Sequence, residues 1–195
     1  MRHQLLFNHL KQTVPISEEE VLKLLDYALI KNYRKKEYLF MQGEFAKYVG
    51  FVNQGCLRYY QIDENGEDHI IYFAIETWWI GDLNSFYSGQ PTGFNLQALE
   101  PCEMFMYDKE RFEKARFEIP TFDQYVKIRH AKATDARLER MMSQLSETAE
   151  TRYLKLLEKF PDIFQRVPQH LIASFLGIQP QSLSRIRKQM SRKES

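Results

Sequence analysis

Residues 169–190 constrain the fold of this chain more than any other segment. The first eight have the apolar spacing of a short helix, Gly177 follows, and Pro180 suits the first turn of a second helix, because a proline there loses no hydrogen bond. Gly177 can adopt the left-handed turn between the two helices, and Ala173 leaves room for the second helix to cross. The spacing therefore predicts a helix-turn-helix, and seven positions match it: Gln169, Ile172, Ala173, Leu176, Gly177, Leu183 and Ile186.

The outward face of this segment has the chemistry of DNA recognition. Arginine can bind guanine, glutamine can bind adenine and serine can bind either, while basic side chains neutralise phosphates. An ordinary helical hairpin with a polar outer face is the alternative, but the matching positions and the basic face together favour DNA binding. The predicted DNA-binding residues are Gln169, His170, Gln179, Gln181, Ser182, Ser184, Arg185, Arg187 and Lys188.

Charge is distributed unevenly along the chain, whose net charge is +1. Residues 151–195 hold nine Lys or Arg and three Asp or Glu, a balance of +6, so residues 1–150 have a balance of −5. A basic C-terminal segment on an acidic body indicates that only this segment meets a polyanion. Charge alone leaves a solvated basic tail as an equal alternative.

Composition excludes several classes of protein. With 44% hydrophobic residues the chain can bury a sizeable core. Its two cysteines, Cys56 and Cys102, are far apart and form no CxxC, which fits buried side chains in a reducing cytoplasm rather than a disulfide framework. We expect no signal peptide, membrane span or metal site, and no enzyme, since no triad spacing, P-loop or GxGxxG occurs.

Residues 38–107 predict a β domain. Short runs rich in β-branched and aromatic residues alternate there with Gly, Asn and Pro. Asn65-Gly66 lies between two such runs and indicates a hairpin, because both residues tolerate positive φ. Many short strands at this spacing favour a barrel or a jelly-roll-like sandwich. The expected strands are residues 38–41, 48–52, 56–62, 69–74 and 104–107.

Helical patterns flank these strands. Ser17 and Glu20 predict a capping box ahead of apolar residues at helical spacing, and we expect that helix to end in the basic cluster of residues 30–36. Residues 109–117 predict a short helix that stops near Pro120.

Residues 121–160 contain no Gly or Pro and predict a long helix. Weak helix formers at residues 143–149 indicate a hinge within it. An apolar stripe at helical spacing is formed by Leu138, Met141, Met142 and Leu145. The stripe can pack on the chain's own body or on the same helix of a second subunit, and its presence on so long a helix favours a homodimer.

This layout resembles the Crp/Fnr family of bacterial transcriptional regulators over about residues 17–190. The resemblance rests on residues 48–60, on residues 79–85 with 90–94 at the place of the family's phosphate-binding cassette, and on the helix-turn-helix. It implies an α+β fold: an N-terminal β-roll (a double-stranded β-helix, jelly-roll-like or cupin-like) with flanking helices, a long dimerisation helix, and a C-terminal all-α helix-turn-helix domain without a full following wing.

The resemblance also implies a division of the chain and a set of partners. The expected domains are a cyclic-nucleotide-binding-like sensor over residues 1–120, a dimerisation helix over 121–147 and a DNA-binding domain over 148–195. The implied partners are a second copy of the chain, double-stranded DNA with a near-palindromic site, and RNA polymerase.

The cassette departs from family members that bind a cyclic nucleotide. In those members a Glu contacts the ribose and an Arg after a Pro pairs with the phosphate, whereas Asp82 and Thr92 stand at these places here. Threonine cannot supply the charge-assisted fork of arginine, and residues 136–138 lack the hydroxyls that reach the base. We therefore expect no cyclic AMP binding in the usual manner and no resident cofactor; the roll holds another small molecule or is an empty scaffold. The candidate effector-pocket residues are Gly81, Asp82, Leu83, Asn84, Thr92, Gly93 and Asn95.

Iron–sulfur and haem sensors do not fit the cysteines and histidine of this sequence. Two cysteines cannot hold an iron–sulfur cluster, and His69 is expected to be a surface or packing residue rather than a haem ligand. The chain ends five residues after Met190, so we expect no wing, with the basic tail in its place. The alternative function is a ligand-binding sensor that acts through protein partners and would not need Arg185 or this tail.

Overall fold

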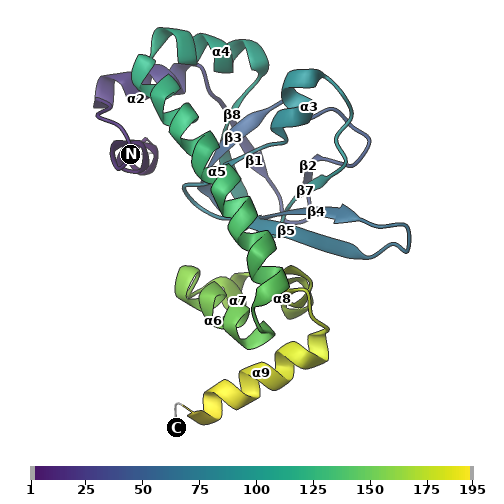
Figure 1. Ribbon diagram of the computed structural model, residues 1–195. Coiled ribbons are helices and arrows are strands. Elements are labelled where there is room, and N and C mark those ends of the chain that lie inside the picture. Colours follow the sequence, from purple (N-terminus) through teal and green to yellow (C-terminus); the bar gives the residue numbers. More distant parts are fainter. Residues whose placement is uncertain (1–2, 194–195) are drawn as a thin grey trace. The chain divides into compact units, whose positions relative to one another are not determined.

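The chain forms two compact units in the computed structural model, which describes residues 3–193 (Figure 1). The first unit consists of Met1–Tyr59 and Phe73–Ala133, and the second consists of Tyr60–Tyr72 and Thr134–Ser195. A hairpin from the middle of the sequence thus belongs to the same unit as the C-terminal helices. The three domains expected from the sequence remain a prediction.

Two four-stranded sheets form the predicted β-roll. Their strand orders are β1-β8-β3-β6 and β2-β7-β4-β5. β8 pairs antiparallel with β1 and with β3, and β2 pairs antiparallel with β7. The strands are β1 (Leu29–Tyr33), β2 (Tyr38–Phe40), β3 (Val49–Gln54), β4 (Leu57–Ile62), β5 (Asp68–Ala74), β6 (Trp79–Ile80), β7 (Asn95–Ala98) and β8 (Cys102–Tyr107).

Helices lie before, within and after the roll. They are α1 (Gln4–Lys11), α2 (Glu18–Asp26), α3 (Leu83–Ser88), α4 (Lys109–Glu118), α5 (Pro120–Ser146), α6 (Ala149–Lys159), α7 (Ile163–Arg166), α8 (Gln169–Leu176) and α9 (Pro180–Lys193). The helix breaks within the predicted hinge segment, because α5 ends at Ser146 and α6 begins at Ala149 with Thr148 as its N-cap. In the described part of the chain no strand follows α9.

The capping box predicted at the start of α2 is confirmed. The Ser17 N–H donates to Glu20 Oε2 at 2.8 Å, and the Glu20 N–H donates to Ser17 Oγ at 3.1 Å. The other oxygen of Glu20 accepts the Thr121 hydroxyl at 2.6 Å. The cap of α2 is therefore also a link to α5.

The prediction that the helix capped by Ser17 extends into residues 30–36 is wrong. α2 ends at Asp26, and β1 pairs in register with β8, from Leu29 opposite Met106 to Tyr33 opposite Cys102. Main-chain hydrogen bonds to a strand some seventy residues away outweigh the local helical spacing of the apolar residues. The basic cluster consequently lies on β1 and on the turn that follows it.

The predicted hairpin between β4 and β5 is present, but its turn depends on Asp63 and Gly66 rather than on Asn65 and Gly66 together. Gly66 has φ +82, and its N–H donates to the Asp63 carbonyl at 3.0 Å. The Asp63 carboxylate accepts the N–H groups of Asn65 at 2.8 Å and Glu67 at 3.0 Å. Asn65 keeps a negative φ, so the glycine and the aspartate, rather than the Asn-Gly pair together, form this turn.

The core of the first unit joins one sheet to five helices. Side chains from β3 and β8 pack with α1, α2, α3, α4 and the start of α5. Aromatic rings dominate this core, including Phe51, Phe105, Phe112, Phe122 and Tyr125, each at most 4% exposed. The first turns of α5 are therefore anchored in the core of the roll.

Several further expectations are settled by burial and helix composition. Cys56 and Cys102 are both buried, as predicted. Within residues 3–193, none of the helices combines the length and the apolar content needed to span a membrane. The sequence did not predict α1, α3, α7, β6 or β7, which have only two to eight residues and therefore give short patterns.

Candidate nucleic-acid interface and effector cassette

The predicted helix-turn-helix is present as α8 and α9. Gly177 ends α8 in the left-handed conformation, with φ +66. The Ile178 N–H donates to the Ala173 carbonyl at 3.0 Å, the wide hydrogen-bonded ring that is typical of a Schellman C-cap. A side chain at position 177 would strain this backbone, so Gly177 determines where the chain turns towards α9.

The small core between α8 and α9 is filled as predicted. Ala173 and Leu183 are fully buried, as the predicted packing of the two helices requires. The other buried members of this core are Ile172, Leu176 and Ile186. Burial on one side of α9 leaves its opposite side exposed.

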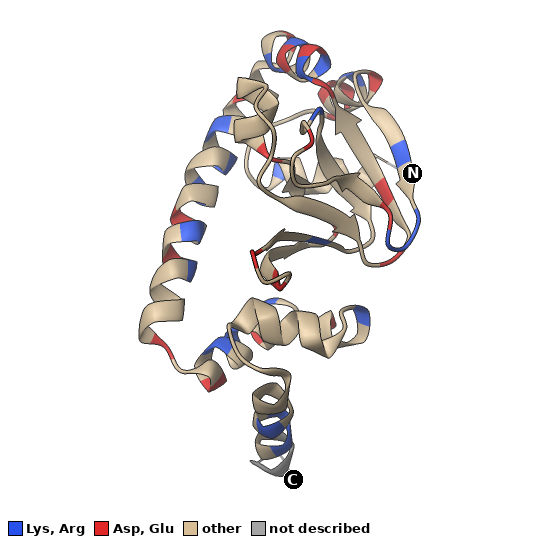
Figure 2. Cartoon of the chain, turned by 90° about the vertical axis from the view of Figure 1, so that its right-hand side faces the viewer, with Lys and Arg blue, Asp and Glu red and all other residues tan. Residues whose placement is uncertain are grey.

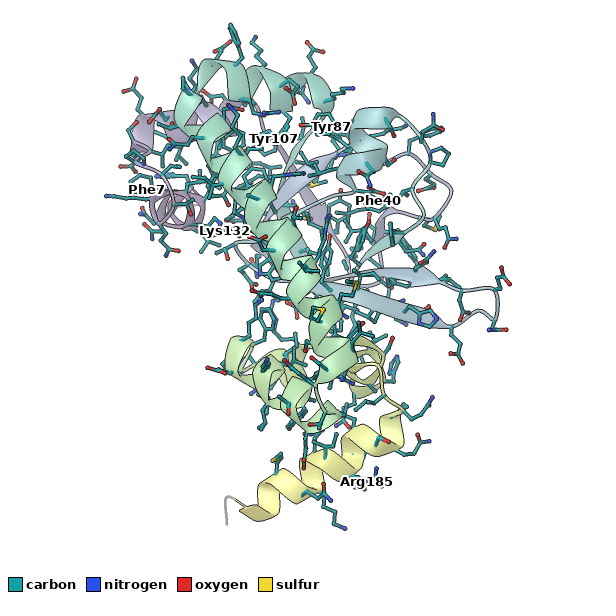
Figure 3. All side chains as sticks on the ribbon, viewed as in Figure 1. Phe7, Phe40, Tyr87, Tyr107, Lys132 and Arg185 are labelled. Carbon is teal, nitrogen blue, oxygen red and sulfur yellow. The ribbon has the colours of Figure 1, made fainter. Side chains whose placement is uncertain are left out.

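That exposed side carries most of the residues predicted to bind DNA. Gln179 directly before α9, and Gln181 and Arg185 on it, are exposed, and among the described residues their side chains have no hydrogen-bond or ion-pair partner. Figure 3 shows Arg185 on this helix. Ser182 is half-buried, and the Ser184 hydroxyl donates to the Pro180 carbonyl at 3.1 Å. Four more of the predicted residues are exposed: Gln169, His170, Ser184 and Lys188.

The charge on α9 has one sign. Figure 2 shows Lys and Arg along this helix, and residues 180–193 contain no Asp or Glu. One basic residue has an additional structural role, because the Arg187 guanidinium lies 4.9 Å from the centre of the Phe164 ring of α7. The sequence did not reveal this contact, and the expected role of Arg187 at a DNA phosphate remains a prediction.

The two ends of α5 differ in burial. Phe122 and Tyr125 near its start are at most 1% exposed. Near its end the predicted apolar stripe is uncovered, with exposed fractions between 51% and 77% for Leu138, Met141, Met142 and Leu145. An exposed apolar stripe of this kind is a candidate surface for a second copy of the chain.

The candidate effector cassette lies on α3 and the loop after it. Asp82 is the N-cap of α3, and its Oδ1 accepts the N–H groups of Asn84 at 3.0 Å and Ser85 at 3.2 Å. Its Oδ2 accepts the Thr92 hydroxyl at 2.6 Å. Both side chains are buried, with exposed fractions of 8% and 3%.

The neighbouring polar groups of the cassette also bind one another. The Ser85 hydroxyl donates to the Gln90 carbonyl at 2.6 Å and accepts the Ala46 N–H at 3.0 Å. Asn95 Oδ1 accepts the Gln42 N–H at 3.1 Å, and Asn95 Nδ2 is buried without a partner among the described residues. The structure therefore brings Asp82, Thr92 and Ser85 together as one hydrogen-bonded group.

The other predicted cassette residues have different surroundings. A Cβ at Gly81 would lie 3.0–3.2 Å from atoms of Tyr48 and Val49, so this glycine allows two chain segments to approach closely. Leu83 is half-buried, while Asn84 and Gly93 are exposed. At position 92, where the resemblance to the Crp/Fnr family implies a place for a phosphate-binding arginine, the chain has a threonine. Its hydroxyl is already bonded to the buried carboxylate of Asp82.

His69 lies on β5 and is exposed, as predicted. Its Nε2 is 2.8 Å from Asp63 Oδ2. The hydrogen bond from His69 lowers the pKa of Asp63 to about 2. His69 is thus part of the hairpin surface.

Comparisons with known proteins agree with this architecture. Residues 30–118 match the family model described as the cyclic nucleotide-binding domain. The structure of the c-di-GMP responsive global regulator CLP of Xanthomonas campestris matches with a TM-score of 0.73 at 12% identity, over 91% of this chain and 93% of that chain. FixK2 from Bradyrhizobium japonicum matches with a TM-score of 0.70 at 19% identity, over 86% of each chain.

A third solved structure, the catabolite activator protein of Thermus thermophilus, matches with a TM-score of 0.56 at 19% identity, over 92% of this chain and 85% of that chain. A comparison with curated protein sequences gave no significant match. Residues 30–118 thus match a cyclic nucleotide-binding domain, and the two helices of the helix-turn-helix, α8 and α9, follow later in the chain. The fold is that of the Crp/Fnr regulators, as the resemblance implied, and none of the matches named here is to a catalytic family.

Proposed function

We propose that this chain is a cytoplasmic, homodimeric, DNA-binding transcriptional regulator of the Crp/Fnr type. The observation that carries the proposal is the exposed face formed by α9 and the residue before it, where Gln179, Gln181 and Arg185 have no partner among the described residues. Polar groups that nothing in the chain binds are available to bind base edges.

The mechanism follows from the geometry of the two helices. α8 and the Gly177 turn hold α9 by its buried side, so the opposite side of α9 can enter the major groove. There Arg185 can form two hydrogen bonds to a guanine, while Lys188 neutralises a phosphate. The apolar stripe at the end of α5 would join two copies, and two recognition helices related by a two-fold axis would read a near-palindromic site. RNA polymerase is the partner through which such a regulator would act on transcription.

The roll is proposed to work without cyclic AMP bound in the usual way. Thr92 donates its hydroxyl to Asp82, and a buried carboxylate beside the phosphate position would repel the phosphate. The input to this regulator is then a different small molecule or none.

The test begins with selection of bound sequences from random DNA, followed by measurement of Arg185→Ala on the selected site. We expect this variant to weaken specific binding by about 1–3 kcal/mol, because one guanine contact is lost. Arg34→Ala is the matched control, since Arg34 is an exposed arginine on the turn between β1 and β2. The proposal is wrong if the wild-type chain selects no sequence at low salt, with or without candidate effectors.

A further inference from the structure

We propose that Arg140 is a positioning residue for the recognition helix: it clasps the β4–β5 hairpin to the end of α8, so that the hairpin and the helix-turn-helix are held as one body. The inference rests on the proposed DNA-binding function. All the groups involved lie within the second compact unit.

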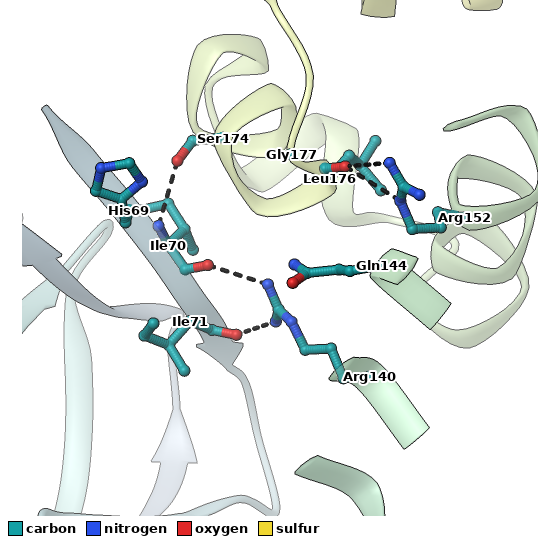
Figure 4. Close-up of a pocket in the computed structure, with 9 residues that line it drawn as sticks. All are labelled: His69, Ile70, Ile71, Arg140, Gln144, Arg152, Ser174, Leu176 and Gly177. Carbon is teal, nitrogen blue, oxygen red and sulfur yellow. Dashed lines mark hydrogen bonds between the residues drawn. The ribbon is translucent and has the colours of Figure 1, made fainter. Parts of the chain in front are cut away.

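The Arg140 guanidinium binds three main-chain carbonyl groups from two elements. Nη2 donates to Ile70 of β5 at 3.0 Å and to Phe175 of α8 at 3.1 Å, and Nη1 donates to Ile71. The guanidinium also lies 3.9 Å from the centre of the Phe175 ring. Figure 4 shows the bonds to the strand beside Ser174 of α8. A planar fork on a single side chain thus joins the strand to the helix.

Ser174 makes a second connection between the same two elements. Its hydroxyl accepts the Ile70 N–H at 3.2 Å and donates to the Asp68 carbonyl at 2.5 Å. β5 is the outer strand of its sheet, where main-chain groups would otherwise lack partners. The Ser174 hydroxyl therefore binds two main-chain groups of β5 that a further strand would otherwise bind.

The clasp acts at the point that sets the direction of α9. Arg152 of α6 donates to the Leu176 carbonyl through Nε at 3.2 Å and Nη2 at 2.9 Å. Together with Arg140 it binds the last carbonyl groups of α8, which have no partner within the helix and form its negative end. Gly177 follows directly, so a change in these bonds alters where α8 ends and where α9 points.

Hydrogen bonds rather than close packing hold this junction. Arg140, Arg152, Ser174 and His69 line a cavity of about 430 Å³ (Figure 4). Arg140 has no carboxylate partner among the described residues. Burial lowers the pKa of Arg140 to about 10, so it is still a cation at neutral pH.

Arg140 also lies away from the surface proposed for dimerisation. It follows Leu138 by two residues, which places it about 200° around α5 from that side chain. Leu138 is 56% exposed, whereas Arg140 is half-buried. A substitution at Arg140 therefore tests the clasp without changing the apolar stripe.

The experiment compares Arg140→Met and Arg140→Lys with Lys132→Met, which removes an exposed cation from the same helix. We measure affinity for the selected DNA site and for random DNA, the dependence of both on salt, and hydrogen exchange of residues 60–72 and 169–176. Both Arg140 variants should bind the selected site at least tenfold more weakly, with affinity for random DNA and the salt slope unchanged, because no phosphate contact is lost. Exchange in the hairpin and α8 should become faster, while Lys132→Met behaves as the wild type.

Each outcome decides the matter. Wild-type specific affinity in Arg140→Met overturns the clasp, and so does an equal loss on selected and random DNA. If Arg140→Met does not fold, Ser174→Ala removes only the bonds of the hydroxyl, and it should give the same pattern at severalfold smaller size. If the wild type binds no DNA, the proposed function fails, and unchanged exchange in the variants would separately refute the clasp.

Discussion

α9 and the α3 cassette hold their polar side chains in opposite ways. On α9 the side chains of Gln181 and Arg185, like that of Gln179 directly before it, are exposed and unpartnered among the described residues. In the cassette the side chains of Asp82 and Thr92 are buried, and they are bonded to each other and to nearby main-chain groups. Both segments have the residue types that bind ligands, but the side chains of Asp82 and Thr92 are already bonded to each other.

The difference shows which contacts support folding and which support recognition. A buried polar group is costly unless it is bonded, so the pairs in the cassette are needed for the roll itself. An exposed polar group is bonded by water, and exchanging that water for a base edge costs little. We therefore expect substitutions in the cassette to change stability and substitutions on the outer face of α9 to change DNA binding.

The largest effect is expected when the buried side of α9 is changed. Leu183→Ala removes a fully buried side chain and should destabilise the helix-turn-helix by about 3 kcal/mol. DNA binding should be lost with it. Urea unfolding followed by circular dichroism measures the change, and Gln181→Ala on the exposed side is the control for stability. Equal stability of the two variants would contradict the assignment of the two faces.

A smaller loss of stability is expected in the cassette. Thr92→Val keeps the shape of the side chain but leaves Oδ2 of the buried Asp82 without its hydroxyl donor, which should cost about 1–3 kcal/mol. Thr121→Val, whose hydroxyl bonds to the more exposed Glu20, should cost less. Thermal unfolding of both variants tests the order, and a Thr92→Val protein as stable as the wild type would show that the pair is not structural.

Acid should act on the first unit through His9 of α1. Burial, and secondly the charge of Arg129, lower the pKa of His9 to about 4, and its Nε2 lies 2.7 Å from the Tyr125 hydroxyl. Because the folded pKa lies below the unfolded value, the unfolded chain binds the proton more readily, and stability falls as pH decreases from about 6.5 towards 4.

Allowing for solvent screening of a partly exposed ring, we expect a loss of about 1 kcal/mol between pH 6.5 and pH 5. His9→Gln, which keeps a hydrogen-bonding side chain at this position, should remove most of this dependence. Urea titrations at the two pH values measure it. A variant with the same pH dependence as the wild type would assign the effect to other groups.

The smallest expected effect is that of cyclic AMP. A ligand present at about 100 times its Kd stabilises a protein by about 2.7 kcal/mol, whereas the bonded Asp82–Thr92 pair predicts no change in Tm at millimolar concentration. A shift of several degrees would mean that the cassette opens to admit a phosphate, and the contrast with α9 would then be lost.

The sequence predicted the helix-turn-helix almost residue by residue. Gly177, Ala173 and Leu183 have the conformations and burial that their spacing indicated. Such motifs are readable because a turn of fixed length and a local apolar pattern largely define them. The capping box at Ser17 and the break between α5 and α6 were predictable for the same reason.

Elements that depend on distant partners were not readable in this way. The local pattern predicts the end of a helix where the structure has β1. The strand forms because it pairs with β8, and no local pattern relates these two segments. The roles of Arg140 and Arg187 were also hidden, since each is defined by a contact with another element, at Phe175 and at Phe164. A basic side chain has the same local pattern whether it binds a carbonyl, an aromatic ring or a phosphate.

The sequence by itself determined that residues 169–190 turn at Gly177 and present polar side chains on one face, because these properties depend on neighbours within a few positions. The resemblance to the Crp/Fnr family, also drawn from the sequence, implied that Thr92 stands where a phosphate-binding arginine would be needed. Only the tertiary structure decided that Thr92 is bonded to Asp82 and that Arg140 binds both β5 and α8. The physical reason is that a hydrogen bond depends on distance in space, and folding brings together groups that the chain keeps apart.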